Sequence, residues 1–339
     1  MSTSNEVQYY ESDFDFDEHA AAVREQINHA EEEPEERLIA KHDENDDSLT
    51  PLSQADSWNQ FHSHHSAGNF YKPRRYLLSA FPCIAQYLAG GDDASSIRVV
   101  LEVGCGSGST CVPIIKECSK RCDMVNENII LLACDCSTTA VETTRRFIDG
   151  LVENESLRRP HFASFDADPS LTIDESPPFL SQVKSAHDDL MRDTELAGQL
   201  VANGDIGVAG IVLLVFVLSA VTPTRVNRFV QQIHETTAPG GKVCFRDYGL
   251  YDLPMLRFDS QACCRSSTSL GDPVYLRGEG TIARFFTLES TRAIFESAGF
   301  TTCELRYCTV YNINRKTRQK LKRVFVHGVF VKPHNDGTT

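Results

Sequence analysis

Several common features are missing from this 339-residue sequence, and each absence excludes a class of protein. The longest apolar stretch, residues 206–221, has 16 residues, fewer than the ~20 that span a bilayer, so no membrane association is expected. Residues 1–10 contain no basic residue and no apolar run, so we expect no secretory signal and a reducing, cytoplasmic environment, with the nucleus as a second expected location. The twelve cysteines include no C-x-x-C motif with a matching second half, so no metal site is predicted.

Basic residues are scarce at the N-terminus. Residues 1–50 hold sixteen of the 47 acidic residues but three of the 33 lysines and arginines, in a chain of net charge −14. A segment with high like charge and few large apolar residues buries too little surface to offset the entropy of ordering. We therefore expect residues 1–50 to be a disordered acidic tail, and residues 51–335 to form one large, nearly neutral domain.

Short apolar runs alternate with helix-forming segments in the central part of the chain. This alternation is typical of an α/β fold with a doubly wound, mostly parallel sheet of the Rossmann-like kind. Residues 169–204 are polar and contain three prolines, so we expect them to form a peripheral, partly helical insertion. The predicted strands are 98–103, 129–135, 161–168, 211–218, 242–247, 303–311 and 323–331, and the predicted helices are 109–122, 138–151, 226–237 and 286–298.

The first predicted strand ends in a glycine-rich turn, Glu102-Val-Gly104-Cys-Gly106-Ser-Gly108. It lacks the third glycine of a dinucleotide fingerprint and the Gly-Lys-Ser/Thr of a phosphate loop. Glu102 would repel a pyrophosphate and attract a cation. S-Adenosylmethionine carries a sulfonium and an ammonium group, and Glu-x-Gly-x-Gly-x-Gly is the turn that methyltransferases of this fold present to it. We therefore predict that this turn binds S-adenosylmethionine.

Acidic residues follow the next two predicted strands as well. Asp135 ends the second strand, where a ribose needs an acceptor for its hydroxyl groups. Asp166, or less favourably Asp168, stands after the third strand, where the adenine amino group would be recognised. A lone aspartate at such a position is usually a loop cap, but three acids at consecutive strand ends favour a methyl-donor site.

The fourth predicted strand excludes two kinds of nucleic-acid methyltransferase. Residues 215–221 contain no Pro-Cys nucleophile of a pyrimidine C5 enzyme and no Asn/Asp-Pro-Pro-aromatic motif of an exocyclic-amine enzyme.

Longer motifs resemble the tRNA 3-methylcytidine methyltransferases, which modify an anticodon-loop cytosine. The resemblance covers residues 58–333. Pro73 replaces an aspartate of the family, Gly210 another aspartate, and Ile282 an arginine. The motifs that carry the resemblance are Trp58-Asn-Gln-Phe61, Phe70-Tyr-Lys72 with Arg74, Ile211 to Val221, Phe245-Arg-Asp-Tyr-Gly-Leu-Tyr-Asp252, and Tyr275-Leu-Arg-Gly-Glu-Gly-Thr281.

The resemblance implies roles for further residues. Residues 58–82 would form an element that covers the cofactor and contacts tRNA, with Trp58 and His62 flanking the cofactor. Ala167 and Val215 would line the adenine pocket. The residues expected to contact RNA are Phe70, Lys72, Arg74, Arg257, Arg277, Arg284 and Arg323.

Methylation of cytosine at N3 does not require a general base, because N3 has an in-plane lone pair and no proton to remove. The product is cationic, so a carboxylate that accepts a hydrogen bond from the N4 amino group would select cytosine and stabilise the developing charge. We predict Asp247 in this role, with Arg246 and Tyr248 shaping the pocket. The alternative is that Arg246 and Asp247 form a structural ion pair.

Positive charge gathers near the C-terminus, where residues 301–332 carry a net charge of +7. Together with the arginines named above, this segment favours RNA binding, with tRNA as the expected partner. An aminoacyl-tRNA synthetase or another accessory protein is a further expected partner. Two alternatives remain open, a protein or small-molecule methyltransferase of the same fold and an inactive cofactor-binding adaptor subunit.

Overall fold

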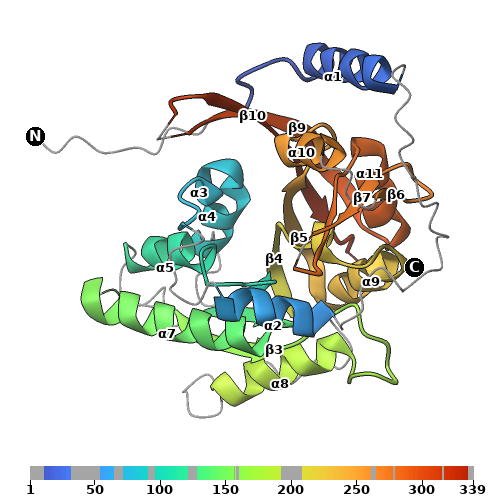
Figure 1. Cartoon of the computed structure of the whole chain (residues 1–339). Helices are drawn as coiled ribbons and strands as arrows, with labels where there is room; N and C mark the ends of the chain where they lie inside the picture. The colour runs from blue at the N-terminus through green and yellow to red at the C-terminus, as the bar shows by residue number, and fades with distance from the viewer. Residues whose placement is uncertain are drawn as a thin grey trace, which may run out of the picture.

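The computed structural model describes residues 11–31, 54–64, 72–90, 96–120, 128–155, 157, 160–191, 208–260, 265–277, 279–314 and 317–334. A seven-stranded sheet lies at its centre, in the order β3-β2-β1-β4-β5-β10-β9 (Figure 1). The first five are parallel, and β10 is antiparallel to β5 and β9. This is the doubly wound, mostly parallel sheet that the sequence predicts. The strands are β1 (Arg98–Val103), β2 (Ile129–Asp135), β3 (His161–Asp166), β4 (Ala209–Val215), β5 (Thr237–Tyr248), β9 (Thr301–Ile313) and β10 (Lys320–Val331).

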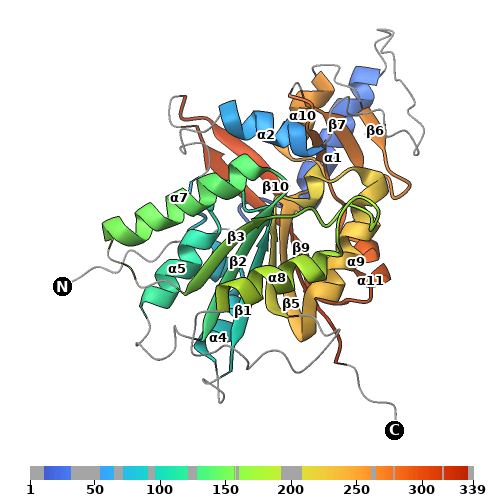
Figure 2. The same ribbon diagram turned by 90° about the horizontal axis from the view of Figure 1, so that it is seen from below.

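Helices cover both faces of this sheet (Figure 2). This double cover explains why β1 and β2 are buried along their whole length and consist mostly of apolar residues. No helix in the described residues is both long and apolar enough to cross a membrane. One face carries α4 (Pro82–Ala89), α5 (Cys111–Ser119) and α7 (Thr138–Glu155), and the other carries α8 (Phe179–Met191), α9 (Val226–Thr236) and α11 (Leu288–Ser297).

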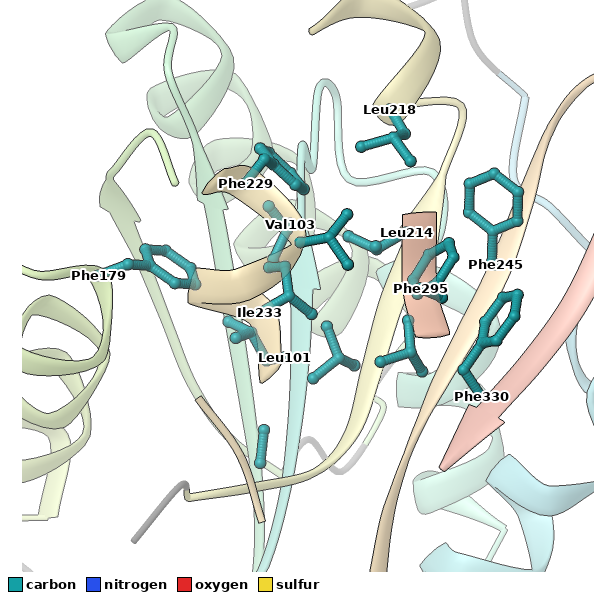
Figure 3. Close-up of a cluster of buried hydrophobic side chains, with 14 of the residues drawn as sticks. Leu101, Val103, Phe179, Leu214, Leu218, Phe229, Ile233, Phe245, Phe295 and Phe330 are labelled. Carbon is teal, nitrogen blue, oxygen red and sulfur yellow. The ribbon is translucent and has the colours of Figure 1, made fainter. Parts of the chain in front are cut away.

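The larger core lies on the α8, α9 and α11 side of the sheet, as Figure 3 shows. Leu101 and Leu214 project from adjacent strands towards Phe229 and Ile233 of α9, and all four side chains are buried. Removing a side chain of this size from water contributes about 1.5–3 kcal/mol each, which is what fixes the helices on the sheet.

Helix α8 corrects the prediction of a peripheral insertion over residues 169–204. Phe179 and Val183 are buried in the larger core, and the helix packs on β3 and α9. It is therefore the crossover helix between β3 and β4, which a right-handed parallel connection requires. The polar face of the helix and the prolines before it concealed this in the sequence. Residues 192–204 lie outside the described residues.

A second, three-stranded sheet was not predicted. It consists of β6 (Arg265–Ser267), β7 (Pro273–Leu276) and β8 (Ile282–Arg284), and it lies close to the 3-10 helix η2 (Leu218–Ala220) that follows β4. Its strands have three or four residues each, too short for a periodic signal. The remaining elements are α2 (Gln54–His64), α3 (Leu77–Ala80), η3 (Pro223–Arg225) and α10 (Leu253–Ser260).

Gly210 departs from the resembled family for a steric reason. A Cβ atom at this position would lie 2.2 Å from the Tyr87 hydroxyl oxygen. That hydroxyl accepts a hydrogen bond from the Val99 N–H at 3.0 Å. Tyr87 thus occupies the space that a side chain at position 210 would need.

The N-terminal segment corrects the prediction of disorder over residues 1–50, because residues 11–31 fold onto the domain. The Asp13 N–H donates to the Thr309 carbonyl at 2.7 Å, and Ser12 forms an isolated parallel β-bridge with Thr309 on the edge of β9. Helix α1 (Phe16–Glu31) follows and lies over the β9–β10 hairpin (Figure 1). The Phe16 ring stacks on Tyr307 with centroids 3.7 Å apart. Residues 1–10 and 32–50 lie outside the described residues.

The docking predicts a measurable effect of Phe16→Ala on stability. Losing the stacked ring removes apolar contact with Tyr307, so the free energy of unfolding should fall by about 1–3 kcal/mol in a denaturant titration. Ala22→Ser, on the exposed side of α1, is the matched control and should change it by less than about 0.5 kcal/mol. Equal stability of the Phe16 variant and wild type would show that the segment does not hold to the domain.

Candidate functional site

A cavity of about 770 Å³ opens at the carboxyl ends of the parallel strands. Ligands of open α/β sheets bind at this edge, where the strand order reverses. The strand order reverses between β1 and β4, and residues that follow both strands line the cavity. The cavity continues from there to the end of β5 and to the β9–β10 hairpin.

The glycine turn after β1 forms the floor of the cavity. Gly104, Gly106 and Gly108 all have positive φ angles, of 72°, 53° and 77°, which favour glycine. A Cβ atom at Gly104 would lie 2.5 Å from Val217. At Gly106 the nearest atom to such a Cβ is His62 Cε1 at 3.8 Å, so the backbone here faces the cavity. The turn thus lets a ligand approach the main chain closely.

Glu102 lies beneath the turn and is 3% exposed. Its Oε2 accepts a hydrogen bond from Cys111 Sγ at 2.7 Å. Burial raises the pKa of Glu102 to about 7, and the hydrogen bond from Cys111 and the charge of Arg74 oppose this shift. A carboxylate in such a position gains most from a ligand that brings a positive charge.

Asp135 ends β2 beside the glycine turn and lines the cavity. Its two oxygens accept hydrogen bonds from the N–H groups of Gly106 at 2.9 Å and Ser137 at 3.0 Å. Burial raises the pKa of the Asp135 carboxyl, while the charge of His62 and these hydrogen bonds lower it. Each carboxylate oxygen has a second lone pair, so both can also accept from a ligand hydroxyl.

Helix α2 covers this half of the cavity and lies beside α7 (Figure 1). Asn59 anchors it, since its Oδ1 accepts from the Ser137 hydroxyl at 2.8 Å. Trp58 and His62 line the cavity on the inner side of the helix, with ring centroids 5.9 Å apart. Both residues therefore lie on the same cavity as the glycine turn, and their place beside the cofactor stays a prediction.

The end of β3 corrects one predicted residue. Asp166 is exposed and does not line the cavity, whereas Asp168 does, and its Oδ1 accepts from the Ser170 N–H at 2.8 Å. The strand ends at Asp166, so Asp168 lies in the loop beyond it and can turn inward. Ala167 and Val215 line the cavity as expected.

Asp247 does not lie where its predicted role requires. The side chain is fully buried and is absent from the cavity wall. Its two oxygens accept from the N–H groups of Ser219 at 2.9 Å and Tyr248 at 2.8 Å. Burial raises the pKa of Asp247 to about 6, although these hydrogen bonds lower it. Asp247 thus holds the loop after β4 against the end of β5.

The neighbours of Asp247 do reach the cavity. Arg246 and Tyr248 belong to an aromatic and cationic wall that we call the acceptor half of the cavity. Tyr248 packs against Phe216 and Phe285, with centroid distances of 5.1 and 5.7 Å. The Arg246 guanidinium lies 4.8 Å from the centre of the Phe325 ring. The acceptor half comprises Phe216, Arg246, Tyr248, Arg277, Phe285, Arg323, Phe325 and the hairpin residues Val310 and Tyr311.

The residues predicted to contact RNA divide into four groups. Arg74, Arg277 and Arg323 line the cavity, although Arg323 also donates twice to Asp252 at 2.8 Å. Lys72 and Arg257 are exposed outside it, and Phe70 lies outside the described residues.

Arg284 corrects the prediction, because it is 3% exposed and pairs with buried Asp272 at 2.6 Å.

These residues fit S-adenosylmethionine. The open space in front of Gly106 admits a ligand against the backbone, and Glu102 and Asp135 supply negative charge and acceptors beside it. The indole and imidazole of Trp58 and His62 supply flat faces opposite the turn. A cationic ligand with a ribose matches this donor and acceptor set.

The space at Gly106 leads to a prediction for Gly106→Ala. Alanine at a positive φ costs about 1 kcal/mol of stability, and its methyl group would occupy the cofactor side of the turn. We expect a folded protein whose affinity for S-adenosylmethionine falls at least tenfold in calorimetry. Gly271→Ala is the matched control, since Gly271 has a φ of 80° and open space around it. A similar loss of affinity in both variants would contradict the assignment of the turn.

The raised pKa of Glu102 predicts a pH dependence of cofactor affinity. The carboxyl gains its charge as the pH rises through about 7, so affinity for the cationic cofactor should increase between pH 5.5 and 7.5. Glu102→Gln should bind S-adenosylmethionine more weakly and without this increase. Its pH profile also serves as the control for titration of the ligand itself. Parallel pH profiles of the two proteins would exclude Glu102 from binding.

Known proteins that resemble this chain are methyltransferases, in agreement with a site that fits S-adenosylmethionine. A profile of the methyltransferase domain family matches residues 77–305. The human tRNA N(3)-cytidine methyltransferase METTL6 is 30% identical over 277 residues, which are 82% of this chain and 80% of that protein. The tRNA(Thr) (cytosine(32)-N(3))-methyltransferase of Saccharomyces cerevisiae is 29% identical over 309 residues, which are 91% of this chain but 42% of that longer protein.

A solved structure shares the fold. The S-adenosylmethionine-dependent methyltransferase from Anabaena variabilis superposes with a TM-score of 0.51 at 11% identity, over 84% of this chain and 96% of that one. The glycine turn, the strand order and these relatives together show that the chain belongs to the tRNA N(3)-cytidine methyltransferase family, within the S-adenosylmethionine-dependent methyltransferases.

Proposed function

We propose that this protein transfers a methyl group from S-adenosylmethionine to N3 of a cytosine in the anticodon loop of tRNA. The observation that carries the proposal is the continuity of one cavity from the glycine turn to the acceptor half. The cofactor-binding residues and an aromatic, arginine-rich wall thus face the same space. Family membership supports tRNA as the substrate.

The acceptor half suits an unpaired pyrimidine. N3 lies on the Watson–Crick edge, so the base must leave its stack, and aromatic side chains are the usual partners of an extruded base. Phe216 has a positive φ of 62°, and its ring packs against Tyr248 and Phe325. A strained backbone held by aromatic packing is a rigid platform for a flat ligand.

The bound cofactor supplies an electrophilic methyl group, and the chain supplies position. Cytosine N3 attacks with its own lone pair, so alignment of the two ligands is the main requirement. We propose that Glu102 and Asp135 hold the cofactor through its ammonium and ribose groups, that Asp168 faces the adenine, and that Tyr248 and Phe216 hold the base. Arg74, Arg277 and Arg323 would then meet the phosphates beside the extruded nucleotide.

Partners and location follow from this substrate. We propose that the protein acts on tRNA in the cytoplasm, with the nucleus as a second location, and that an aminoacyl-tRNA synthetase or another accessory protein assists in selecting the tRNA.

Nucleoside analysis tests the proposal. Purified protein, unmodified total tRNA and isotope-labelled S-adenosylmethionine should yield labelled 3-methylcytidine. Asp135→Ala should reduce the yield through weaker cofactor binding, since each lost hydrogen bond to a charged group costs about 1.5–3 kcal/mol.

Label in another nucleoside, or label that enters protein and survives ribonuclease treatment, would contradict the proposal. Tight cofactor binding without transfer to any tRNA, with and without a cell extract, would indicate an adaptor subunit.

A further inference from the structure

A carboxylate beside the target base would assist the proposed reaction, and Asp247 does not provide it. A cytosine methylated at N3 is a cation, and a carboxylate beside its amino group would both select the base and stabilise the charge. Asp247 is fully buried and absent from the cavity wall, and its two oxygens accept hydrogen bonds from the backbone N–H groups of Ser219 and Tyr248. The five acidic residues that line the cavity in the described part of the chain are Asp13, Glu102, Asp135, Asp168 and Glu279.

Three of these acids belong to the cofactor side. Glu102 lies near the end of β1, Asp135 ends β2, and Asp168 lies in the loop after β3. Asp13 and Glu279 remain for the acceptor half. Glu279 is exposed in the turn between β7 and β8, where water screens its charge, whereas Asp13 is half-buried.

Asp13 is held firmly at its place. Its N–H donates to the Thr309 carbonyl at 2.7 Å, and its Oδ2 accepts from the Tyr311 N–H at 2.8 Å. The next side chain, Phe14, packs against the Tyr311 ring with centroids 5.2 Å apart. Among the described residues, no hydrogen bond to the other oxygen of Asp13, Oδ1, is found. The carboxylate is therefore preorganised and keeps one oxygen for a ligand.

The N-terminal segment places Asp13 on the hairpin that carries Arg323 of the acceptor half. Val310 and Tyr311 of β9 pair in register with Arg323 and Lys322 of β10, and Val310, Tyr311 and Arg323 line the cavity. Asp13 contacts this hairpin from its outer edge and reaches the same cavity. The N-terminal segment is thus a wall of the site as well as a cover for the edge of β9.

We infer that Asp13 is a specificity-determining residue, whose free carboxylate oxygen accepts a hydrogen bond from the exocyclic amino group of the target cytosine. This inference rests on the proposed function. Uracil presents a carbonyl oxygen in place of the amino group, so the same carboxylate repels it. The negative charge also faces the positive ring of the product, which favours transfer over binding alone.

Asp13→Asn tests the inference with little change in structure. The asparagine amide oxygen can still accept from the Tyr311 N–H, while the NH₂ group replaces the free acceptor. We expect kcat/KM for tRNA to fall at least tenfold, with an unchanged melting temperature and unchanged affinity for S-adenosylmethionine. Asp17→Asn, an equal change of charge at an exposed site on α1 that does not line the cavity, is the control and should stay within twofold of wild type.

A modified substrate separates recognition of the amino group from a structural effect. An anticodon stem-loop that carries pyrimidin-2-one riboside at the target position keeps N3 but lacks the amino group. On this substrate wild type and Asp13→Asn should differ by less than twofold, because the interaction is already absent. A tenfold difference that persists on this substrate, or no difference on cytidine, overturns the inference while wild-type activity on tRNA leaves the proposed function intact. Absence of wild-type activity on every tRNA would instead be a failure of the proposed function.

Discussion

The site depends on one constraint, which is that the backbone of the turn after β1 packs closely against neighbouring strand ends and leaves its other side open to a ligand. Gly104 has no room for a side chain, because Val217 from the loop after β4 fills that space. Gly106 donates its N–H to Asp135 at the end of β2. The turn therefore ties together three neighbouring strand ends, and the open space in front of Gly106 follows from that arrangement. A glycine-rich turn that bound its ligand through side chains would not need this geometry.

A second constraint comes from the edge of the sheet. β9 is an edge strand of the sheet, so one side of it would expose unpaired backbone groups, which proteins usually cover. Residues 11–14 cover part of it through backbone hydrogen bonds to Thr309, and Phe14 and Phe16 hold them through the tyrosines of β9. The cover also brings the Asp13 carboxylate to the cavity. A structural need of the fold thereby places a charged group at the site.

The sequence predicts those parts of the fold in which local pattern and tertiary packing agree. β1 and β2 match their predicted bounds because both faces are buried and most of their residues are apolar. The acidic segment at residues 11–31 was missed because composition favours disorder, whereas two phenylalanines and the buried Ala20 and Val23 decide its docking. Short strands such as β8 carry no periodic signal, and Arg284 therefore looked like a surface cation.

The site shows the same division. The glycine turn and Asp135 could be predicted because strand ends and glycine spacing fix them locally. The positions of Asp247 and Asp13 could not, because they depend on which side of a strand end faces the cavity and on a contact that spans almost the whole chain. Resemblance to a family could identify the Arg246-Asp247-Tyr248 segment as important, but it could not show which of its side chains reaches the ligand.

The central claim is that one cavity holds the methyl donor at the glycine turn and an extruded cytosine against the acceptor half. A crystal structure with S-adenosylhomocysteine and an anticodon stem-loop tests this most directly. We expect the target ring to pack against Phe216 and Tyr248, with its amino group within hydrogen-bonding distance of Asp13. A base bound outside the cavity, with residues 11–14 remote from the RNA, would contradict it.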